Sequence, residues 1–259
     1  MTSKASGHQV SEAVAARPEG FDADPADVAG EVVTHGTSGL KLSLDRIVAN
    51  DRIVEEIEAG RYEAEELSIS CDYVRPEDRV LELGAGVGFI SAGVMRRVGP
   101  AFYAAVEADA RLIPHIRRTH ALNDIVGAKV LNAAFASDPD MLARGSVSFT
   151  LHREFWRSGI GQDQPGITET VAVPAVDASA FLAENRINVL IADIEGAELD
   201  LLRHLDTAGV ERVVLELHPQ RFGLQGVAEV FALLGARGFA YDAGPSRGPV
   251  VCFRKIGTD

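Results

Sequence analysis

Cysteine, long hydrophobic runs and basic residues are all scarce in this sequence, and each scarcity excludes a class of protein. Cys71 and Cys252 are too few for a disulfide framework or for a zinc site built from cysteines. No uninterrupted apolar run approaches the roughly 20 residues that span a bilayer, so we expect no membrane segment. The opening residues, MTSKASGHQV, lack the apolar core of a signal peptide, and we therefore expect a cytoplasmic protein.

The balance of charge is acidic. The chain has 25 Lys and Arg against 38 Asp and Glu, which gives a net charge of −13. Proteins that bind nucleic acid neutralise its phosphates with basic side chains, so this balance argues against a nucleic-acid partner. With 259 residues, 46% of them hydrophobic, the chain can bury the core of one large domain, with or without an appendage.

The first 75 residues differ from the rest of the chain. Residues 1–40 are mostly small and polar and show no helical or strand period, which predicts a flexible or loosely docked arm. Over residues 41–75 apolar residues recur at helical spacing among charges, as at Ile53, Val54 and Ile57, and this predicts a helical extension. Residues 76–259 then form the main domain.

From residue 79 onward, short β-branched runs alternate with longer amphipathic segments. Strands are expected at residues 79–83, 102–106, 129–133, 189–192, 213–217, 239–242 and 250–254. Helices are expected at residues 89–98, 110–122, 197–205 and 227–236, with a long irregular stretch over 137–170. This alternation predicts an α/β fold with a doubly wound parallel sheet. The last two strands, joined by a turn at 244–248, must pair as an antiparallel edge hairpin.

A glycine-rich turn follows the first of these strands, in Glu82-Leu83-Gly84-Ala85-Gly86-Val87-Gly88-Phe89. Glycines between a strand and a helix allow a sharp turn and a close approach of a ligand to the backbone. A dinucleotide fingerprint would require its third glycine at position 89, which is Phe89 here. An acid at the strand end, Glu82, suits a positively charged ligand, and S-adenosylmethionine (SAM) carries an ammonium and a sulfonium.

Acidic residues also end the neighbouring strands. Glu107 follows the glycine turn by about 20 residues, which is the position of an acid that accepts hydrogen bonds from ribose hydroxyls, whereas Asp109 is expected to cap the next helix. Further along, Asp193 and Glu195 follow one strand and His218 follows another. Because ligands of open α/β sheets bind beyond the carboxyl ends of strands, these side chains should face the same crevice. Glu198 could share it or complement the helix dipole.

Together these segments resemble the FkbM family of class I SAM-dependent methyltransferases, from about Gly60 to Gly238. The motifs that carry the resemblance are Gly60-Arg61-Tyr62-Glu63, Glu82 to Gly88, Val106-Glu107, Asn123, Val173-Pro174-Ala175-Val176-Asp177 and Asp193-Ile194-Glu195-Gly196-Ala197-Glu198. The chain departs from the family where it has Glu82 for Asp, Gly86 for Asn and Ile191 for Lys.

The resemblance implies a seven-stranded Rossmann-like sheet, SAM as methyl donor, and methylation of a hydroxyl on a sugar or natural product. Glu63 would reach the methionine ammonium of SAM, unless it is only an exposed helix acid. We therefore expect the donor to contact Glu63, Glu82, Gly84, Ala85, Gly86, Glu107, Ala108, Ala134 and Asp193.

Methyl transfer to an alkyl hydroxyl benefits from a base that removes the hydroxyl proton. The candidates are Asp193, His218 and Glu195, of which we favour His218 or Asp193. A variant of this mechanism has the same carboxylates holding a divalent cation, although the sequence assigns no metal ligand. Acceptor specificity is expected in the connection 137–187, where His152, Phe155 and Trp156 form either part of an acceptor wall or a small hydrophobic cluster.

Three other functions are compatible with this fold class. A nicotinamide-dependent oxidoreductase is disfavoured by Phe89, and a non-catalytic SAM-binding protein would never release S-adenosylhomocysteine. A nucleic-acid methyltransferase is disfavoured by the net charge and by the lack of an Asn/Asp-Pro-Pro-aromatic motif. The partner expected is a small hydroxylated molecule, with neither a nucleic acid nor a membrane.

Overall fold

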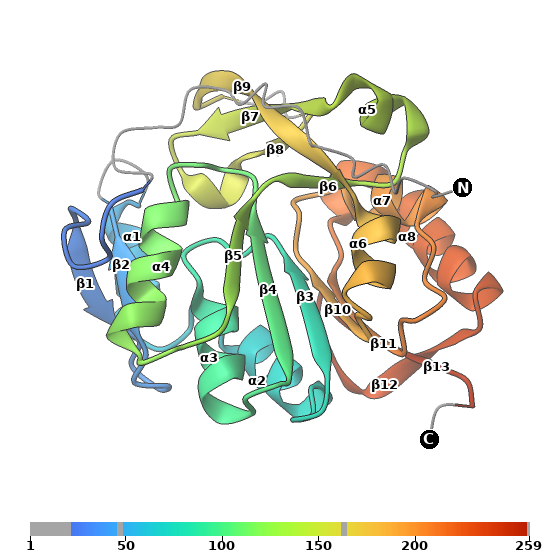
Figure 1. The fold of residues 1–259 in the computed structure, drawn as a ribbon, viewed down its shortest axis with the longest axis horizontal. Helices are drawn as coiled ribbons and strands as arrows, with labels where there is room; N and C mark the ends of the chain where they lie inside the picture. Colours follow the sequence, from blue (N-terminus) through green and yellow to red (C-terminus); the bar gives the residue numbers. More distant parts are fainter. Residues whose placement is uncertain (1–21, 46–48, 162–164, 258–259) are drawn as a thin grey trace, which may run out of the picture.

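The computed structural model describes residues 22–45, 49–161 and 165–257 of the chain. Its centre is a seven-stranded sheet with the order β12-β13-β11-β10-β3-β4-β5 (Figure 1). The strands are β3 (Arg79–Leu83), β4 (Phe102–Glu107), β5 (Lys129–Asn132), β10 (Val189–Ala192), β11 (Arg212–Glu216), β12 (Phe239–Arg247) and β13 (Val250–Lys255). The five strands β5, β4, β3, β10 and β11 are parallel, and β13 lies antiparallel between β11 and β12. The predicted Rossmann-like sheet with its antiparallel terminal hairpin is confirmed.

Helices cover both faces of this sheet, because its strands are apolar on both sides. In β3, Val80 belongs to one buried cluster and Leu81 to the other, as the two-residue period of a strand requires. The first cluster includes helices α1 (Asp51–Glu58), α2 (Ala64–Tyr73), α3 (Phe89–Arg97) and α4 (Ile113–Leu122). The second cluster includes helices α6 (Ala178–Glu184), α7 (Glu198–His204) and α8 (Pro219–Ala236).

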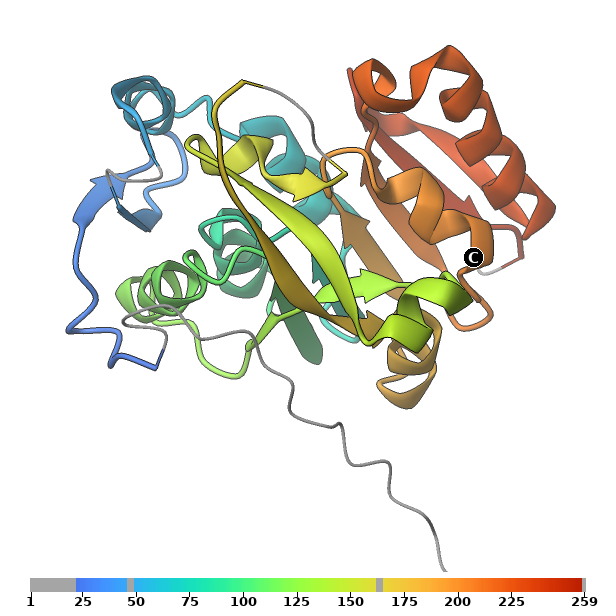
Figure 2. The same ribbon diagram turned by 90° about the horizontal axis from the view of Figure 1, so that it is seen from above.

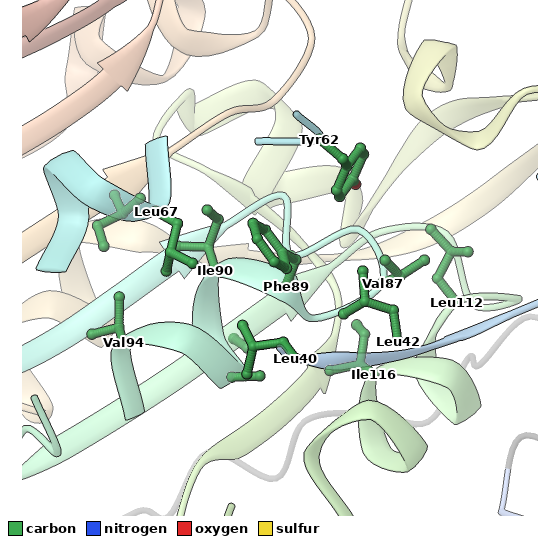
Figure 3. Close-up of a cluster of buried hydrophobic side chains, with 14 of the residues drawn as sticks. Leu40, Leu42, Tyr62, Leu67, Val87, Phe89, Ile90, Val94, Leu112 and Ile116 are labelled. Carbon is green, nitrogen blue, oxygen red and sulfur yellow. The ribbon is translucent and has the colours of Figure 1, made fainter. Parts of the chain in front are cut away.

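The prediction of a loose arm over residues 1–40 is wrong for its last part. Strands β1 (Glu31–Thr34) and β2 (Lys41–Leu44) form an antiparallel hairpin, so residues 41–44 are not helical either. Leu40 and Leu42 are buried, and Figure 3 shows them beside Phe89 and Ile116. These two leucines dock the hairpin on the domain, although the segment as a whole is too polar for its composition to predict such a contact. Residues 1–21 lie outside the described residues.

The expected irregular stretch over 137–170 is also wrong in part, because it contains paired strands. A second sheet has the order β6-β9-β7-β8, formed by β6 (Ala134–Ala136), β7 (Ser146–His152), β8 (Gly159–Ile160) and β9 (Ile167–Asp177). A helix, α5 (Pro139–Arg144), precedes β7, and a single 3₁₀ turn, η1 (Phe155–Arg157), follows it. Figures 1 and 2 show this sheet lying across one edge of the central sheet, beyond the ends of β3 and β4.

Several element boundaries differ from the predicted ones. Helix α8 begins at Pro219 rather than at 227, with a kink at Gly223, and β12 continues to Arg247 through the predicted turn, with an irregularity between Asp242 and Arg247. Within the described ranges, no helix is both long and apolar enough to cross a membrane.

Candidate active site

A cleft opens at the carboxyl ends of β3, β4 and β10, with about 800 Å³ of empty space when its open mouth is included. The central sheet supplies its floor, and the second sheet and η1 supply its opposite wall. The predicted site residues that line it are Glu63, Gly84, Gly86, Glu107, Ala108, Ala134, Asp193 and Glu195. Residues far apart in the sequence therefore meet at one edge of the sheet, as the parallel topology requires.

The glycine turn approaches the end of β10 so closely that a side chain cannot fit. Gly84 has a φ of +87°, and a Cβ placed there would lie 1.7 Å from the carbonyl oxygen of Asp193. The backbone N–H groups of Gly84 and Ala85 both donate to the carbonyl oxygen of Val106, at 2.9 and 3.0 Å. Ala85 itself is buried and does not line the cleft, so its predicted contact with the donor is not supported by its position.

Glu107 links the glycine turn to the end of β4. Its Oε2 accepts the backbone N–H of Gly86 and its Oε1 accepts that of Asp109, both at 2.8 Å. The side chain is buried, and burial raises the pKa of Glu107 to about 7, against the opposing effect of these hydrogen bonds. Each carboxylate oxygen retains a second lone pair, as hydrogen bonding to two ribose hydroxyls requires. Asp109 accepts from the backbone and side chain of Arg111, but α4 begins at Ile113 with Leu112 as its N-cap and no side-chain cap, so the predicted helix-capping role of Asp109 is wrong.

An apolar slot extends from Glu107 toward the second sheet. Ala108 and Ala134 line it together with Leu112, Phe135 and Phe149. The side chain of Asn132 holds this wall in place, because its Nδ2 donates to the backbone carbonyls of Glu107 and Ala108 at 2.9 and 3.0 Å. The slot has the apolar lining that a planar adenine ring needs, beside the acid expected to bind the ribose.

Glu63 and Glu82 lie at the other end of the cleft. Glu63, at the start of α2 with a φ of +46°, lines the cleft and also a smaller cavity behind it, and burial raises its pKa to about 7. Glu82 lines only the smaller cavity; it is 2% exposed, and burial raises its pKa to about 8. Both acids are thus placed to meet a cation rather than solvent.

His218 lies behind the two predicted catalytic carboxylates. Its Nε2 is 3.5 Å from Asp193 Oδ1 and 3.7 Å from Glu195 Oε2. The ring is 3% exposed, and His218 is not among the residues that line the cleft. Burial lowers its pKa, but the hydrogen bond of Glu198 and the charges of Glu198, Glu195 and Glu216 together outweigh burial, and the net pKa of His218 is raised. Of the three predicted bases, Asp193 and Glu195 are the two that reach the cleft.

Glu198 is a site residue whose role the sequence left open. It is fully buried, and its Oε1 lies 3.0 Å from His218 Nδ1. The same oxygen accepts the backbone N–H groups of Ile194 and Gly196, at 2.9 and 3.3 Å. Glu198 therefore orients both the imidazole and the loop that carries Glu195. The signal available in the sequence was its place in the motif that ends β10.

Glu195 is held at the cleft wall in an uncommon backbone conformation. Its φ is +54°, in the left-handed region that residues with a side chain seldom adopt. Burial raises the pKa of Glu195 to about 7, while the charge of His218 opposes that rise. For Asp193, burial comes first and the charges of Glu216 and Glu66 follow, and together they raise its pKa well above the ordinary value.

The aromatic residues of the connection divide between the wall and the interior. Phe155 and Trp156, from η1, line the cleft with their rings in edge contact, 5.2 Å between centroids. His152 is 2% exposed and does not line the cleft; its Nε2 lies 2.9 Å from the carbonyl oxygen of Pro165. Phe155 and Trp156 therefore border the cleft and also belong to a buried hydrophobic cluster, whereas His152 lies off the cleft wall.

A comparison with known protein families identifies the family to which this chain belongs. The family model for the methyltransferase FkbM domain matches residues 73–241, which include the glycine turn, Glu107 and the Asp193–Glu198 loop. The chain belongs to the FkbM methyltransferase family. Its donor is SAM. The cleft described above offers an apolar slot, a buried carboxylate beside the glycine turn, and further acids at its other end. No protein of curated function matches the chain by sequence.

Solved structures that are similar to this chain include several methyltransferases. The TYW2 protein of M. jannaschii, solved in complex with AdoMet, is 11% identical over 88% of this chain and 89% of its own, with a TM-score of 0.45. Precorrin-6y C5,15-methyltransferase from Geobacter metallireducens is 10% identical over 83% of this chain and 94% of its own, with a TM-score of 0.44. An rRNA methylase from Streptococcus thermophilus is 11% identical over 74% of this chain and 94% of its own, with a TM-score of 0.40.

Proposed function

We propose that this methyltransferase transfers the methyl group of SAM to a hydroxyl of a small molecule, such as a sugar or a natural product, in the cytoplasm. The acceptor enters the cleft between the carboxylates at the end of β10 and the aromatic pair Phe155–Trp156. The net charge of −13 favours a small molecule over a nucleic acid as acceptor.

The observation that supports this proposal is the position of Glu195. It lines the cleft, it has a pKa of about 7, and its backbone is held in the left-handed region by the loop that Glu198 anchors. A base with a pKa near the working pH combines a useful ionised fraction with sufficient basicity. We therefore assign the role of base to Glu195, with Asp193 beside it and His218 in the layer behind.

The proposed reaction is an in-line displacement. The acceptor oxygen attacks the methyl carbon, the carbon–sulfur bond breaks, and S-adenosylhomocysteine leaves with the electron pair. The hydroxyl proton passes to the carboxylate of Glu195 as the new carbon–oxygen bond forms. The cleft contributes by aligning donor and acceptor, and the carboxylate contributes by removing the proton.

The test combines a product screen with the Glu195→Gln variant. Incubation with deuteromethyl SAM and a panel of hydroxylated sugars and natural products should yield an O-methylated product by mass spectrometry. Glu195→Gln should lower kcat by about 10²–10⁴-fold, because Gln cannot accept the proton, while the Kd for SAM stays close to that of the wild type.

The matched control is Glu184→Gln, an exposed acid on α6, which should leave kcat unchanged. Full turnover of Glu195→Gln would remove Glu195 from the mechanism. An N-methylated product, or SAM binding with no S-adenosylhomocysteine released by any acceptor, would refute the proposed function.

A further inference from the structure

A smaller cavity lies directly behind the cleft. The two share Glu63, Leu83, Gly84 and Asp193, so the smaller cavity continues the donor cleft past the glycine turn. Its far wall comes from helix α2 and from the end of β11, which carries Glu216. No residue of this far wall takes part in the reaction proposed above.

Five carboxyl groups surround this cavity, from Glu63, Glu66, Glu82, Asp193 and Glu216. No Lys, Arg or His side chain is among the described residues that line it. Carboxylates this close repel one another strongly in a poorly hydrated space. The ammonium and sulfonium of the donor supply two positive charges for five carboxyl groups, so most of these groups have no compensating cation when they are ionised.

Three of these acids converge on one point. One carboxylate oxygen each of Glu66, Asp193 and Glu216 lies within 4.8 Å of the other two. Metal–oxygen distances are about 2.1 Å for Mg²⁺ and about 2.4 Å for Ca²⁺, so two ligands of one ion lie at most about 4–5 Å apart. The 4.8 Å limit equals the largest separation of two ligands on one Ca²⁺ ion, and a smaller Mg²⁺ or Mn²⁺ ion would draw the three oxygens closer together by a few tenths of an ångström.

Two further buried side chains point to a missing polar partner in the same cavity. Ser70 is 1% exposed and Glu82 is 2% exposed, and both line the cavity. Within the described residues, neither Ser70 Oγ nor Glu82 Oε2 has a hydrogen-bond partner. Buried polar atoms are almost always paired, so these two mark a space for a polar occupant. The water molecules of a hydrated cation can satisfy both, since water both donates and accepts.

We propose that Glu66, Asp193 and Glu216 bind a hard divalent cation of the Mg²⁺ and Mn²⁺ type, whose water ligands are bound by Ser70 and Glu82. Carboxylate oxygens are the ligands such ions prefer. The alternative cluster of Asp193, Glu198 and His218 is less suited, because Glu198 Oε1 already engages His218 Nδ1 and two backbone N–H groups. This site goes beyond the proposed function and does not depend on it.

The test measures metal binding directly, with no donor and no turnover. Full-length protein is treated with a chelator, dialysed and titrated with MnCl₂, and free Mn²⁺ is followed by its six-line electron paramagnetic resonance signal. The wild type should remove one equivalent of Mn²⁺ from solution, and excess Mg²⁺ should release it.

Glu66→Gln and Glu216→Gln should each weaken Mn²⁺ binding by at least about tenfold, because each loses a charged ligand. Glu65→Gln is the matched control: Glu65 is an exposed acid on the same helix that does not line the cavity, and its variant should bind as the wild type does. Circular dichroism of each variant checks that it is folded. Because Glu66 and Glu216 lie on separate elements, α2 and β11, the second variant still tests the proposal if the first does not fold.

The proposal is wrong if the wild type leaves Mn²⁺ free at millimolar concentration, or if all three variants bind it equally. Calorimetry with S-adenosylhomocysteine on the same samples separates this result from the proposed function. A protein that binds S-adenosylhomocysteine but does not bind Mn²⁺ would show that the acids serve an ammonium group only. Mn²⁺ binding without S-adenosylhomocysteine binding would leave the metal site standing and refute the assigned donor cleft.

Discussion

At the scale of single residues, Glu107 shows how one buried carboxylate can organise a binding site. It receives one backbone N–H from the glycine turn and one from its own loop, so it fixes the two segments that must enclose the donor. The spacing from the glycine turn was enough to predict its position, because a strand–turn–helix unit brings the end of the next strand beside the turn. The hydrogen bonds that hold the acid there could not be predicted.

Replacing Glu107 should therefore weaken donor binding specifically. Glu107→Gln keeps an acceptor for one backbone N–H but loses the charged oxygen that the ribose needs. Hydrogen bonds to a charged group contribute about 1.5–3 kcal/mol, so the Kd for S-adenosylhomocysteine should rise about 10- to 100-fold in isothermal titration calorimetry. Glu77→Gln, an exposed acid before β3, should leave the Kd unchanged. An unaltered Kd in Glu107→Gln would exclude the ribose role.

At the scale of elements, the β1–β2 hairpin is held to the domain by one polar side chain as well as by its leucines. The Oδ1 of Asn123 accepts the backbone N–H of Lys41 at 3.0 Å. Its Nδ2 donates to the carbonyls of Lys41 and Thr119, both at 2.7 Å. Asn123 is 7% exposed, so water cannot replace these bonds without rearrangement. The hairpin is thus docked on α4, next to the helix that follows the glycine turn.

Asn123→Ala should loosen this hairpin without unfolding the domain. Removing a buried amide leaves the backbone groups of Lys41 unpaired, which costs about 2–3 kcal/mol in the free energy of unfolding. Urea denaturation measures that loss, and hydrogen exchange locates it: the amide of Lys41 should exchange faster, whereas the amides of β3 should not. Equal acceleration in β3, or no acceleration at Lys41, would contradict a local docking role.

The hairpin and the second sheet were both missed in the sequence for a physical reason. Strands β1 and β2 have four residues each, and β9 begins with the polar run Thr168-Glu169-Thr170 and contains Pro174. Four-residue strands are too short to show a clear period, and in β9 the polar residues and the proline interrupt the apolar run by which the central strands were recognised. Their stability comes from pairing and from the surface on which they dock, and neither can be seen in a local pattern.

At the scale of the whole molecule, several acids of this acidic chain are held away from solvent, and this makes its stability depend on pH. The buried acids Glu63, Glu82 and Glu107 have pKa values of about 7, 8 and 7, raised in each case mainly by burial. In the unfolded chain each carboxyl titrates near 4.5, the ordinary pKa of a glutamate side chain, so above that pH the folded protein binds more protons than the unfolded one. The stability that these groups contribute is fully present below about pH 4.5, and it is lost as pH rises from there through 7 to 8.

The protein without donor or metal should thus become less stable from pH 6 to pH 8. A raised carboxyl contributes up to about 1.4 kcal/mol per pH unit, so the three groups together should lower the free energy of unfolding by about 2 kcal/mol or more. Urea denaturation in the presence of a chelator measures the change. Glu82→Gln should show a smaller loss over the same range, because it removes the acid with the highest of the three pKa values. A flat or rising profile in the wild type would contradict the burial of these charges.

The succession of central strands along the chain, the turn at Gly84 and Gly86, and the acids at the strand ends could all be predicted from the sequence. These features depend on local hydrophobic period and on the geometry of the strand–turn–helix unit, which is the same wherever it occurs. Tertiary structure alone decided that Ala85 and His218 lie off the cleft wall, that Glu198 orients the loop of Glu195, and that Glu66 faces Glu216. These relations join residues on separate elements, and their distances follow from how the helices pack on the sheet rather than from spacing along the chain.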